Sequence, residues 1–426
     1  MINVLIFPAG EINAIELHSS LSKCFNIKLY GASSVERHGE YVYENYISGL
    51  PFISDENFFY EFNKIIEELE IKLIFPTHDT IAEFLSKNES KIKCKVICAE
   101  KKTSELCRSK AMTYDLFSTY DFNPKVYHSL DNIKDINFPL FTKPSKGQGS
   151  VGATLVLNEE EAKDINLDEN VLTEYLPGKE YTIDCFTSFN GELIIALPRL
   201  RMRTMAGVSV SGKTVPITEE IHAIAKSINE NVKFNGLWFF QIKEDCFGKL
   251  KLLEISTRTA GTMCLSRAKG YNLPLLSVYN ALEKNISLID NNYEVEVDRT
   301  LINRFKLNVK YNNVYIDYDD TIIIRSKVNL DAIRYLYQLK NNNKNIFLIT
   351  RHAGDIYESL KKYNIPVELF NSVLHLNPDD LKSGFIAEKE SIFIDNSFQE
   401  RNEVRVKLGI PVFDVDAIEV LLDWKC

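Results

Sequence analysis

Long hydrophobic runs are missing from this sequence of 426 residues. No apolar stretch approaches the roughly 18–20 residues that a membrane-spanning helix requires. The first apolar run, Met1–Phe7, has no basic residues before it and is soon followed by Glu11, unlike a secretory signal peptide. We therefore expect Met1–Phe7 to be a first β-strand, and we expect no membrane partner.

Clustered cysteines and an excess of basic residues are also missing. The eight cysteines are scattered, with no Cys-x-x-Cys pair and no Cys/His group at zinc-binding spacing. They are expected to be the reduced thiols of a cytoplasmic protein, with disulfides as the alternative. Fifty basic residues against fifty-nine acidic ones give a net charge of −9. That charge repels polyanions and no basic patch is evident, so no nucleic-acid partner is expected.

The sequence does have the composition of a globular protein, with 45% hydrophobic and 26% charged residues. Apolar strand-like runs alternate with helical patterns over residues 1–103, which predicts a small doubly wound α/β domain. Longer β segments and Gly-rich turns follow over 104–290, and 291–309 is predicted to be a connector. Strand–helix alternation resumes over 310–426. The predicted fold class is therefore multidomain, combining α/β and α+β parts.

The middle region has a lysine just ahead of a glycine-rich loop. Phe138–Pro144 predicts a strand that ends near Lys143, and residues 145–152 form the loop. An ammonium group there neutralises charge, and glycines let backbone N–H groups approach the oxygens of a polyphosphate. A plain Gly-rich hairpin between two strands would have the same sequence.

The segment Leu172–Glu180 follows the end of an apolar strand. Such a segment can offer backbone edges to an adenine, and Glu180 can accept hydrogen bonds from ribose hydroxyls. A turn with solvated acidic residues is the alternative.

Three arginines alternate along the next predicted strand, at Arg199, Arg201 and Arg203. Side chains at every second position of a strand share a face, so the three guanidinium groups would point the same way. That arrangement suits a phosphate or carboxylate ligand. A solvated basic edge is the alternative.

A predicted hairpin completes the middle region. Gly236–Gln241 and Leu252–Arg258 are joined by a turn at Gly248, which would place oxygens of Gln241 and Glu254 side by side. Hard oxygen ligands at strand ends suit Mg²⁺ that carries ATP phosphates. A core hairpin with two polar ends is the alternative.

Together and in this order, these features resemble the ATP-grasp ligases, the superfamily of biotin carboxylase, carbamoyl phosphate synthetase and D-alanine–D-alanine ligase. The resemblance covers roughly residues 1–290 and implies a small domain ahead of a two-lobed ATP-grasp domain. It implies that ATP and Mg²⁺ are the cofactors, and that a carboxylate is phosphorylated and then attacked by an amine or another nucleophile. The residues that it assigns to the nucleotide are Lys110, Lys143, Gly147, Gly149, Ser150, Gly152, Glu174, Tyr175, Leu176 and Glu180.

The same resemblance assigns metal ligands and a catalytic arginine. Gln241 and Glu254 would coordinate Mg²⁺, with Ser256 as a further ligand. Arg258 would face the acyl phosphate, while the three alternating arginines would hold the substrate acid. Ser256 stands where the family usually has Asn, and Gln241 replaces a more frequent acid, which lowers the negative charge of the site.

A second set of polar residues ends three predicted strands in the C-terminal region. Carboxyl ends of strands in a doubly wound sheet converge on one crevice. Crowded carboxylates there require a cation or a catalytic task. Three ordinary strand ends with solvated acids are the alternative. The residues in question are Asp317, Asp319, Thr350, Lys382 and Asp395.

This second set resembles the haloacid dehalogenase-like (HAD) phosphatases, whose first signature is Asp-x-Asp-x-Thr. The resemblance makes Asp317 the nucleophile and Asp319 the general acid/base. Thr350 and Lys382 would hold the phosphate, and Asp395 would bind Mg²⁺ together with Asp317 and Asp319. Only about thirty residues separate Asp317 from Thr350 and Thr350 from Lys382, too few for an added domain. The C-terminal region is therefore expected to be a capless, HAD-like Rossmannoid domain.

We predict from these patterns a bifunctional enzyme, a carboxylate–amine ligase fused to a phosphatase. Its partners would be a small-molecule carboxylate, an amine or other nucleophile, and a phosphorylated metabolite, and the chain could form a homo-oligomer. Two alternatives stay open: the HAD-like domain serves only for docking, or the chain is an ATP-sensing regulator. His78 and His352 are lesser candidates for lining the two sites.

Overall fold

The computed structural model describes residues 1–35, 38–130, 137–147, 149, 151–205, 207–289, 291, 293–300, 302, 304–305, 307–387 and 389–423. The chain divides into two units, Met1–Leu301 and Ile302–Cys426. Among the described residues, no helix has both the length and the apolar character needed to cross a membrane.

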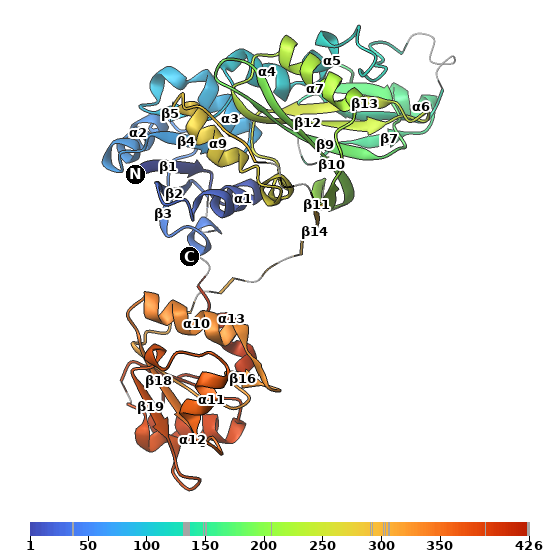
Figure 1. The fold of residues 1–426 in the computed structure, drawn as a ribbon. Helices are drawn as coiled ribbons and strands as arrows, with labels where there is room; N and C mark the ends of the chain where they lie inside the picture. Colours follow the sequence, from blue (N-terminus) through green and yellow to red (C-terminus); the bar gives the residue numbers. More distant parts are fainter. Residues whose placement is uncertain are drawn as a thin grey trace. The chain divides into compact units, whose positions relative to one another are not determined.

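The first unit begins with a five-stranded parallel sheet in the order β3-β2-β1-β4-β5 (Figure 1). The strand order reverses between β1 and β4, and open α/β sheets form a crevice at such a point. The sequence analysis does not predict β3, whose side chains are only partly buried. It predicts the last strand at Val96–Ala99, whereas β5 covers Lys95–Val96. The elements are β1 (Ile2–Phe7), α1 (Ile12–Leu21), β2 (Ile27–Ser33), β3 (Asn45–Ser48), α2 (Phe58–Glu68), β4 (Leu73–Pro76), α3 (Asp79–Lys87) and β5 (Lys95–Val96).

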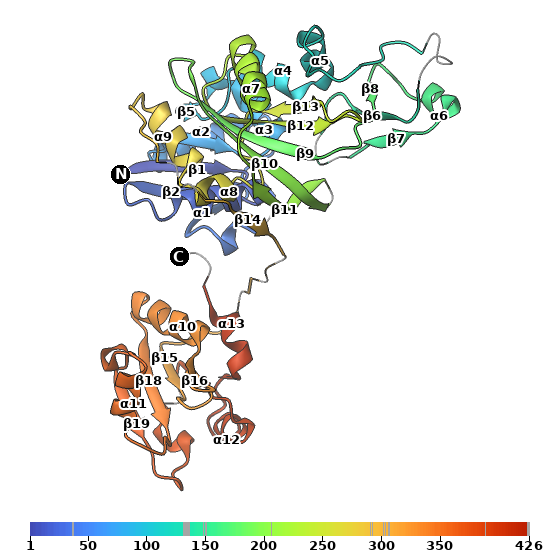
Figure 2. The same ribbon diagram turned by 45° about the vertical axis from the view of Figure 1, so that its right-hand side comes forward.

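Two antiparallel sheets follow in the same unit, a small one in the order β7-β6-β8 and a larger one in the order β13-β12-β9-β10-β11-β14. Figures 1 and 2 both show the small sheet and α6 at the end of the unit away from β1–β3. The elements are α4 (Lys101–Arg108), α5 (Lys110–Leu116), β6 (Leu140–Pro144), β7 (Thr154–Val156), α6 (Glu159–Lys163), β8 (Asn170–Glu174), β9 (Glu180–Thr187), β10 (Leu193–Met205), β11 (Val208–Thr214), α7 (Glu219–Asn231), β12 (Gly236–Glu244), β13 (Leu250–Ser256), α8 (Cys264–Ala268), α9 (Leu273–Ala281) and β14 (Glu296–Asp298).

Part of the predicted connector 291–309 belongs to the large sheet. Residues Glu296–Asp298 form β14, which pairs antiparallel with β11. The predicted connector therefore contains an edge strand of the first unit.

The large sheet is the middle layer of the first unit because β12 is apolar on both faces. Trp238 and Phe240 pack in one cluster with α7, and the Trp238 ring stacks on Phe234 at 3.9 Å. Leu237 and Phe239 face the other way, into a cluster with β1, α1 and α9. Alternate side chains of a strand point to opposite faces, so this continuous apolar run seals both layers.

The second unit is a five-stranded parallel sheet in the order β19-β18-β15-β20-β21. Its central strand, β15, lies between β18 and β20. A two-stranded hairpin, β16–β17, follows β15, and no added domain interrupts the described residues between β15 and β20. The elements are β15 (Asn313–Ile316), β16 (Ile323–Ile324), β17 (Lys327–Val328), α10 (Leu330–Asn341), β18 (Asn345–Thr350), α11 (Ile356–Lys362), β19 (Ser372–His375), β20 (Ser391–Ile394), α12 (Phe398–Leu408), β21 (Val412–Phe413) and α13 (Ile418–Leu421).

Candidate functional site

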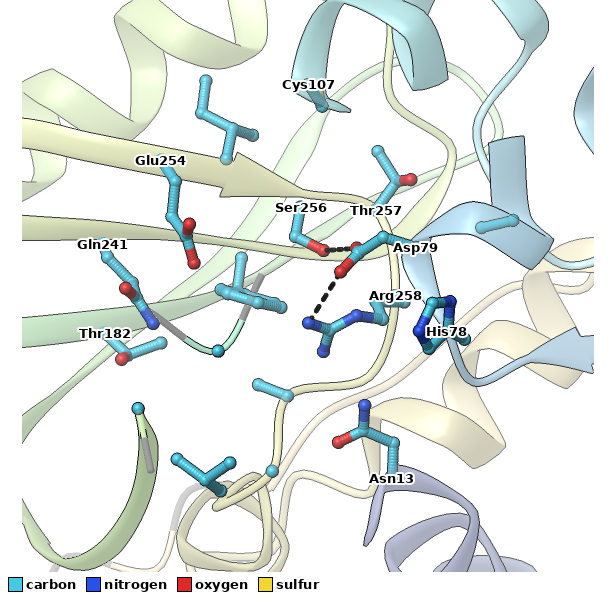
Figure 3. Close-up of a pocket in the computed structure, with 18 of the residues that line it drawn as sticks. Asn13, His78, Asp79, Cys107, Thr182, Gln241, Glu254, Ser256, Thr257 and Arg258 are labelled. Atoms are coloured by element: carbon cyan, nitrogen blue, oxygen red, sulfur yellow. Dashed lines mark hydrogen bonds and ion pairs between the residues drawn. The ribbon is translucent and has the colours of Figure 1, made fainter. Parts of the chain in front are cut away.

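Two cavities in the first unit share part of their walls. The Tyr175 cavity is bounded by the small sheet and the adjoining ends of the large one, and Tyr175 and Lys143 line it. The Arg258 cavity lies where the crevice of the first sheet meets the large sheet, and Asp79 and Arg258 line it (Figure 3). The residues common to both are Lys110, Gly147, Gly149, Arg201, Gly207, Gln241 and Glu254. A ligand could therefore extend from one cavity into the other.

The Tyr175 cavity contains most of the residues that the sequence assigns to a nucleotide. Lys143 enters from β6, Glu174 ends β8 and Glu180 begins β9. The Glu174 carboxylate accepts a hydrogen bond from the backbone N–H of Lys125 at 2.8 Å, which fixes the strand end. Leu176 is buried beside the half-exposed Tyr175, so an apolar wall is available for a flat ring.

Two lysines lie at the inner wall of this cavity. The Lys143 Nζ donates to the Leu253 carbonyl at 3.0 Å and lies 5.4 Å from the centre of the Tyr114 ring. Burial lowers the pKa of Lys143 to about 8, although Glu254 and Glu180 act in the opposite direction. Burial also lowers the pKa of Lys110, whose Nζ lies 3.8 Å from Glu254. Both groups would gain from an added anion such as a phosphate.

The titration of Lys143 gives a testable pH dependence. MgADP affinity of the wild type is expected to fall as the pH rises through about 8, because the amine loses its charge there. Lys143→Met is expected to bind MgADP about 10–100-fold more weakly at pH 7, the value of one charge-assisted hydrogen bond. Its affinity should then vary little between pH 7 and 9.5, which calorimetric titration would measure. An unchanged pH profile in the variant would contradict a phosphate contact for Lys143.

The glycine loop borders both cavities. Gly147 and Gly149 line them, and Gly152 lies outside both walls. Gly152 has a φ of +74°, and an added Cβ would lie 2.9 Å from the Pro144 ring, so this position favours glycine. The predicted Ser150 lies outside the described residues.

Gln241 and Glu254 meet at the junction of the two cavities. The hairpin predicted from the sequence is present, and β12 and β13 pair Gln241 directly with Glu254 (Figure 3). No group of three or more His, Cys, Asp or Glu residues in the described part of the chain could hold a metal ion. One carboxylate with an amide oxygen nevertheless fits Mg²⁺, which is usually bound by one or two carboxylates and completed by substrate phosphates.

The three alternating arginines do not share one cavity. Arg199 and Arg201 line the Arg258 cavity, whereas Arg203 is exposed and pairs with Asp298 at 2.7 Å. Register shifts between Arg201 and Arg203 break the period of two on which the prediction depended. Arg201 pairs with Glu180 and donates to the Gln241 side-chain oxygen at 3.3 Å.

Arg199 is committed to an internal partner. Its guanidinium donates two hydrogen bonds of 3.0 Å to Asp184, and both side chains are nearly or fully buried. Thr262 accepts a third hydrogen bond, and the Ser266 hydroxyl donates to Asp184 at 2.7 Å. Each charge is thus paired and hydrogen-bonded within the protein.

We expect Arg199→Met to lower the free energy of unfolding of the first unit by about 3–5 kcal/mol, because it leaves Asp184 buried without its partner. Arg203→Met is the matched control, and an exposed pair should contribute at most about 1 kcal/mol. Urea denaturation would measure both. The chain has two tryptophans, so a Trp424→Phe background lets Trp238 fluorescence report on the first unit alone. Equal effects of the two substitutions would contradict a structural role for Arg199.

Asp79, which the sequence analysis missed, links the two sheets at the Arg258 cavity. Its carboxylate accepts from the Ser256 hydroxyl at 2.9 Å and pairs with Arg258 at 2.9 Å (Figure 3). Although burial opposes it, Arg258 and Ser256 lower the pKa of Asp79, so the carboxylate is charged. Asp79 begins α3 directly after β4, and the end of a strand beside a reversal of strand order was the available signal. His78 also lines this cavity.

The second unit brings four predicted residues together at strand ends. Asp317 follows β15, Thr350 ends β18 and Asp395 follows β20, on three adjacent parallel strands. The Lys382 Nζ lies 2.7 Å from Asp317 Oδ1 and 2.6 Å from Asp395 Oδ2, so it bridges the two carboxylates. All four side chains are buried.

Burial governs the protonation of this cluster. It raises the pKa of Asp317 to about 7, with Asp395 adding to the effect and Lys382 opposing it. It also raises the pKa of Asp395, again against Lys382. Two buried carboxylates on neighbouring strands fit a Mg²⁺ ion, which would stabilise their charged forms.

Asp319 lies at the exposed edge of this cluster. Its oxygens lie 2.9 and 3.0 Å from Nδ1 of His352, and about half of its side chain is accessible. A carboxylate in contact with both solvent and an imidazole can exchange protons with either. Asp319 therefore has the access that a general acid/base requires.

The fold of the first unit is shared with a known class of proteins. The first ~300 residues have the ATP-grasp fold, as the sequence resemblance implies. Residues 166–309 match a family model described as "ATP-grasp in the biosynthetic pathway with Ter operon". No curated protein sequence matches the chain.

Particular solved structures share this fold at low sequence identity. The biotin carboxylase domain of 2-oxoglutarate carboxylase from Hydrogenobacter thermophilus has a TM-score of 0.54 at 18% identity, covering 67% of this chain and 70% of that one. L-amino acid ligase from Bacillus licheniformis has a TM-score of 0.53 at 16% identity, covering 68% and 75%. N5-carboxyaminoimidazole synthetase from Staphylococcus aureus, solved with ADP, has 0.54 at 15%, covering 67% and 78%. The phosphatase assignment of the second unit stays a prediction.

Proposed function

We propose that the first unit is an ATP- and Mg²⁺-dependent ligase that joins a carboxylate to an amine or another nucleophile. The carrying observation is the Gln241–Glu254 pair at the junction of two cavities, with Lys110 and Lys143 beside it. Two ADP-bound relatives in fold, the H. thermophilus carboxylase domain and the S. aureus synthetase, support a nucleotide in the Tyr175 cavity.

In this proposal each group has a role set by its place. Lys110 and Lys143 neutralise the phosphates, while Glu180 accepts from the ribose hydroxyls. Gln241 and Glu254 hold Mg²⁺, which supplies charge neutralisation during phosphoryl transfer. Arg258 faces the carboxylate that becomes the acyl phosphate, with Asp79 fixing its direction. Ser256 donates its hydroxyl hydrogen to Asp79, which leaves the lone pairs of its oxygen available, so we propose it as a further Mg²⁺ ligand.

Calorimetric titration of the full chain with MgADP tests nucleotide binding first. A panel of carboxylates paired with amines is then screened for ADP release. Binding together with release by at least one pair is the expected result. Tight binding with no stimulation by any pair would instead favour the ATP-sensing regulator.

We propose that the second unit is a Mg²⁺-dependent phosphatase of the HAD type. The carrying observation is the Lys382 bridge between Asp317 and Asp395 at adjacent strand ends, beside Thr350. Asp317 attacks phosphorus as the ester bond breaks, and Asp319 gives a proton to the leaving alcohol. Asp319 then takes a proton from water, which hydrolyses the aspartyl phosphate and releases phosphate.

Hydrolysis of p-nitrophenyl phosphate by the full chain with Mg²⁺ tests this second function, and a phosphorylated metabolite would be its natural substrate. Inactivity on a broad panel of phosphate esters would favour the docking role.

A cytoplasmic location and a homo-oligomeric state are part of the proposal. The H. thermophilus carboxylase domain crystallised as a dimer, which supports the homo-oligomeric state.

A further inference from the structure

One arginine on the wall of the Arg258 cavity differs from the others in its partners. Among the described residues, Arg199, Arg201 and Arg258 each form an ion pair with a carboxylate. Arg108 instead donates to two neutral acceptors, the Gly147 carbonyl at 2.9 Å and the Thr80 hydroxyl at 3.4 Å. No described carboxylate lies within ion-pairing distance of Arg108, so its charge is available to an anionic ligand.

The position of Arg108 puts this charge beside the junction of the two cavities. Arg108 ends α4, and Lys110 begins α5 two residues later. Both side chains donate to the same Gly147 carbonyl, since the Lys110 Nζ lies 3.2 Å from it. Gly147 lines both cavities, whereas Arg108 lines only the Arg258 cavity. The guanidinium is therefore on the side of the glycine loop that faces the Arg258 cavity, where we propose that the substrate carboxylate binds.

The charge of Arg108 acts on titratable groups on both sides of the junction, Asp79 and Lys110. Burial raises the pKa of Asp79, whereas Arg258 and Ser256 lower it, and the charge of Arg108 adds a smaller lowering effect. Burial is the largest cause of the lowered pKa of Lys110, and Lys143 and Arg108 add to it against the opposing charge of Glu254. An anion between Lys110 and Arg258 would thus feel Arg108 directly.

We propose that Arg108 binds the phosphoryl group during its transfer from ATP to the substrate carboxylate. This inference rests on the proposed ligase function. In the step, a carboxylate oxygen forms a bond to the γ-phosphorus, the bond to the bridging β–γ oxygen breaks, and ADP leaves with that electron pair. Arg108 releases the Gly147 carbonyl and donates to the equatorial oxygens, where an arginine can contribute on the order of 10³-fold or more in rate. Arg108 does not line the Tyr175 cavity, and the contact it makes with the wall of that cavity is the hydrogen bond to the Gly147 carbonyl.

Fluoroaluminate provides the test because MgADP with aluminium fluoride mimics a phosphoryl group in transit. Calorimetry would compare the affinity for MgADP alone with that for MgADP plus fluoroaluminate in the full chain. The wild type is expected to bind MgADP plus fluoroaluminate at least about 100-fold more tightly than MgADP alone, because the fluoroaluminate complex resembles the transition state. Arg108→Gln should keep the MgADP affinity within about threefold and lose at least about tenfold of the fluoroaluminate gain.

Two further variants sharpen this test. Lys102→Gln removes an exposed cation of the same helix and should behave as the wild type does. Arg108→Lys keeps the charge without the planar fork and should give an intermediate gain. A gain that is absent from the wild type, or unchanged in Arg108→Gln, would overturn the role of Arg108. Failure of the wild type to bind MgADP would overturn the ligase function itself, and this role with it.

Discussion

Asp317→Asn is expected to lower Mg²⁺-dependent hydrolysis of p-nitrophenyl phosphate by about 10⁴-fold or more, as loss of a covalent nucleophile does in other hydrolases. Asparagine has nearly the same shape as aspartate, so the packing at the end of β15 is retained. Its amide cannot form the aspartyl phosphate. Lys382 keeps a charged partner in Asp395, 2.6 Å away, so the cluster should stay folded.

Asp320→Asn is the matched control for this experiment. Asp320 is an exposed acid only three residues away, and its φ of +53° is one that asparagine tolerates. The control should keep wild-type turnover. If the wild type and Asp317→Asn are equally inactive across the ester panel, the phosphatase function is wrong and the docking role is favoured.

The sheets could be predicted wherever burial leaves a clear pattern. Leu237–Phe240 is apolar at consecutive positions, as expected of a strand covered on both faces, and the Gly248 turn then fixes the hairpin of β12 with β13. β3 has no such pattern, because Asn45–Ser48 is an edge strand with partly exposed side chains. β14 has none either, since its three residues are charged or only half-buried.

The candidate site could be predicted where one segment supplies the chemistry. Lys143 precedes its glycine loop directly, and Asp317 directly follows its strand. Asp79 was missed because its partner Ser256 is 177 residues away, and only the packing of two sheets joins them. The prediction that the three alternating arginines point the same way was wrong for a different reason. A bulge lies between Arg201 and Arg203, and residue types do not reveal a bulge.

Glu254→Gln is expected to abolish the Mg²⁺ dependence of nucleotide binding in the first unit and to reduce ligation at least about 10³-fold. Glutamine keeps the size of the side chain and its pairing opposite Gln241. It removes the only carboxylate of that cross-strand pair, leaving two amides, and neutral oxygens bind Mg²⁺ poorly without a charged ligand. Lys110, 3.8 Å from Glu254, would also lose its ion-pair partner.

Titration with ADP in Mg²⁺ and in EDTA separates the loss of the metal ligand from the loss of the ion-pair partner of Lys110. The wild type should bind ADP more tightly with Mg²⁺, whereas Glu254→Gln should bind it equally in both, since Lys110 and Lys143 still attract the phosphates. Glu230→Gln, an exposed carboxylate on α7, should behave as the wild type does. A Mg²⁺ effect that persists undiminished in Glu254→Gln would mean that the metal is held elsewhere. In that case the junction of the two cavities would not be the centre of phosphoryl transfer.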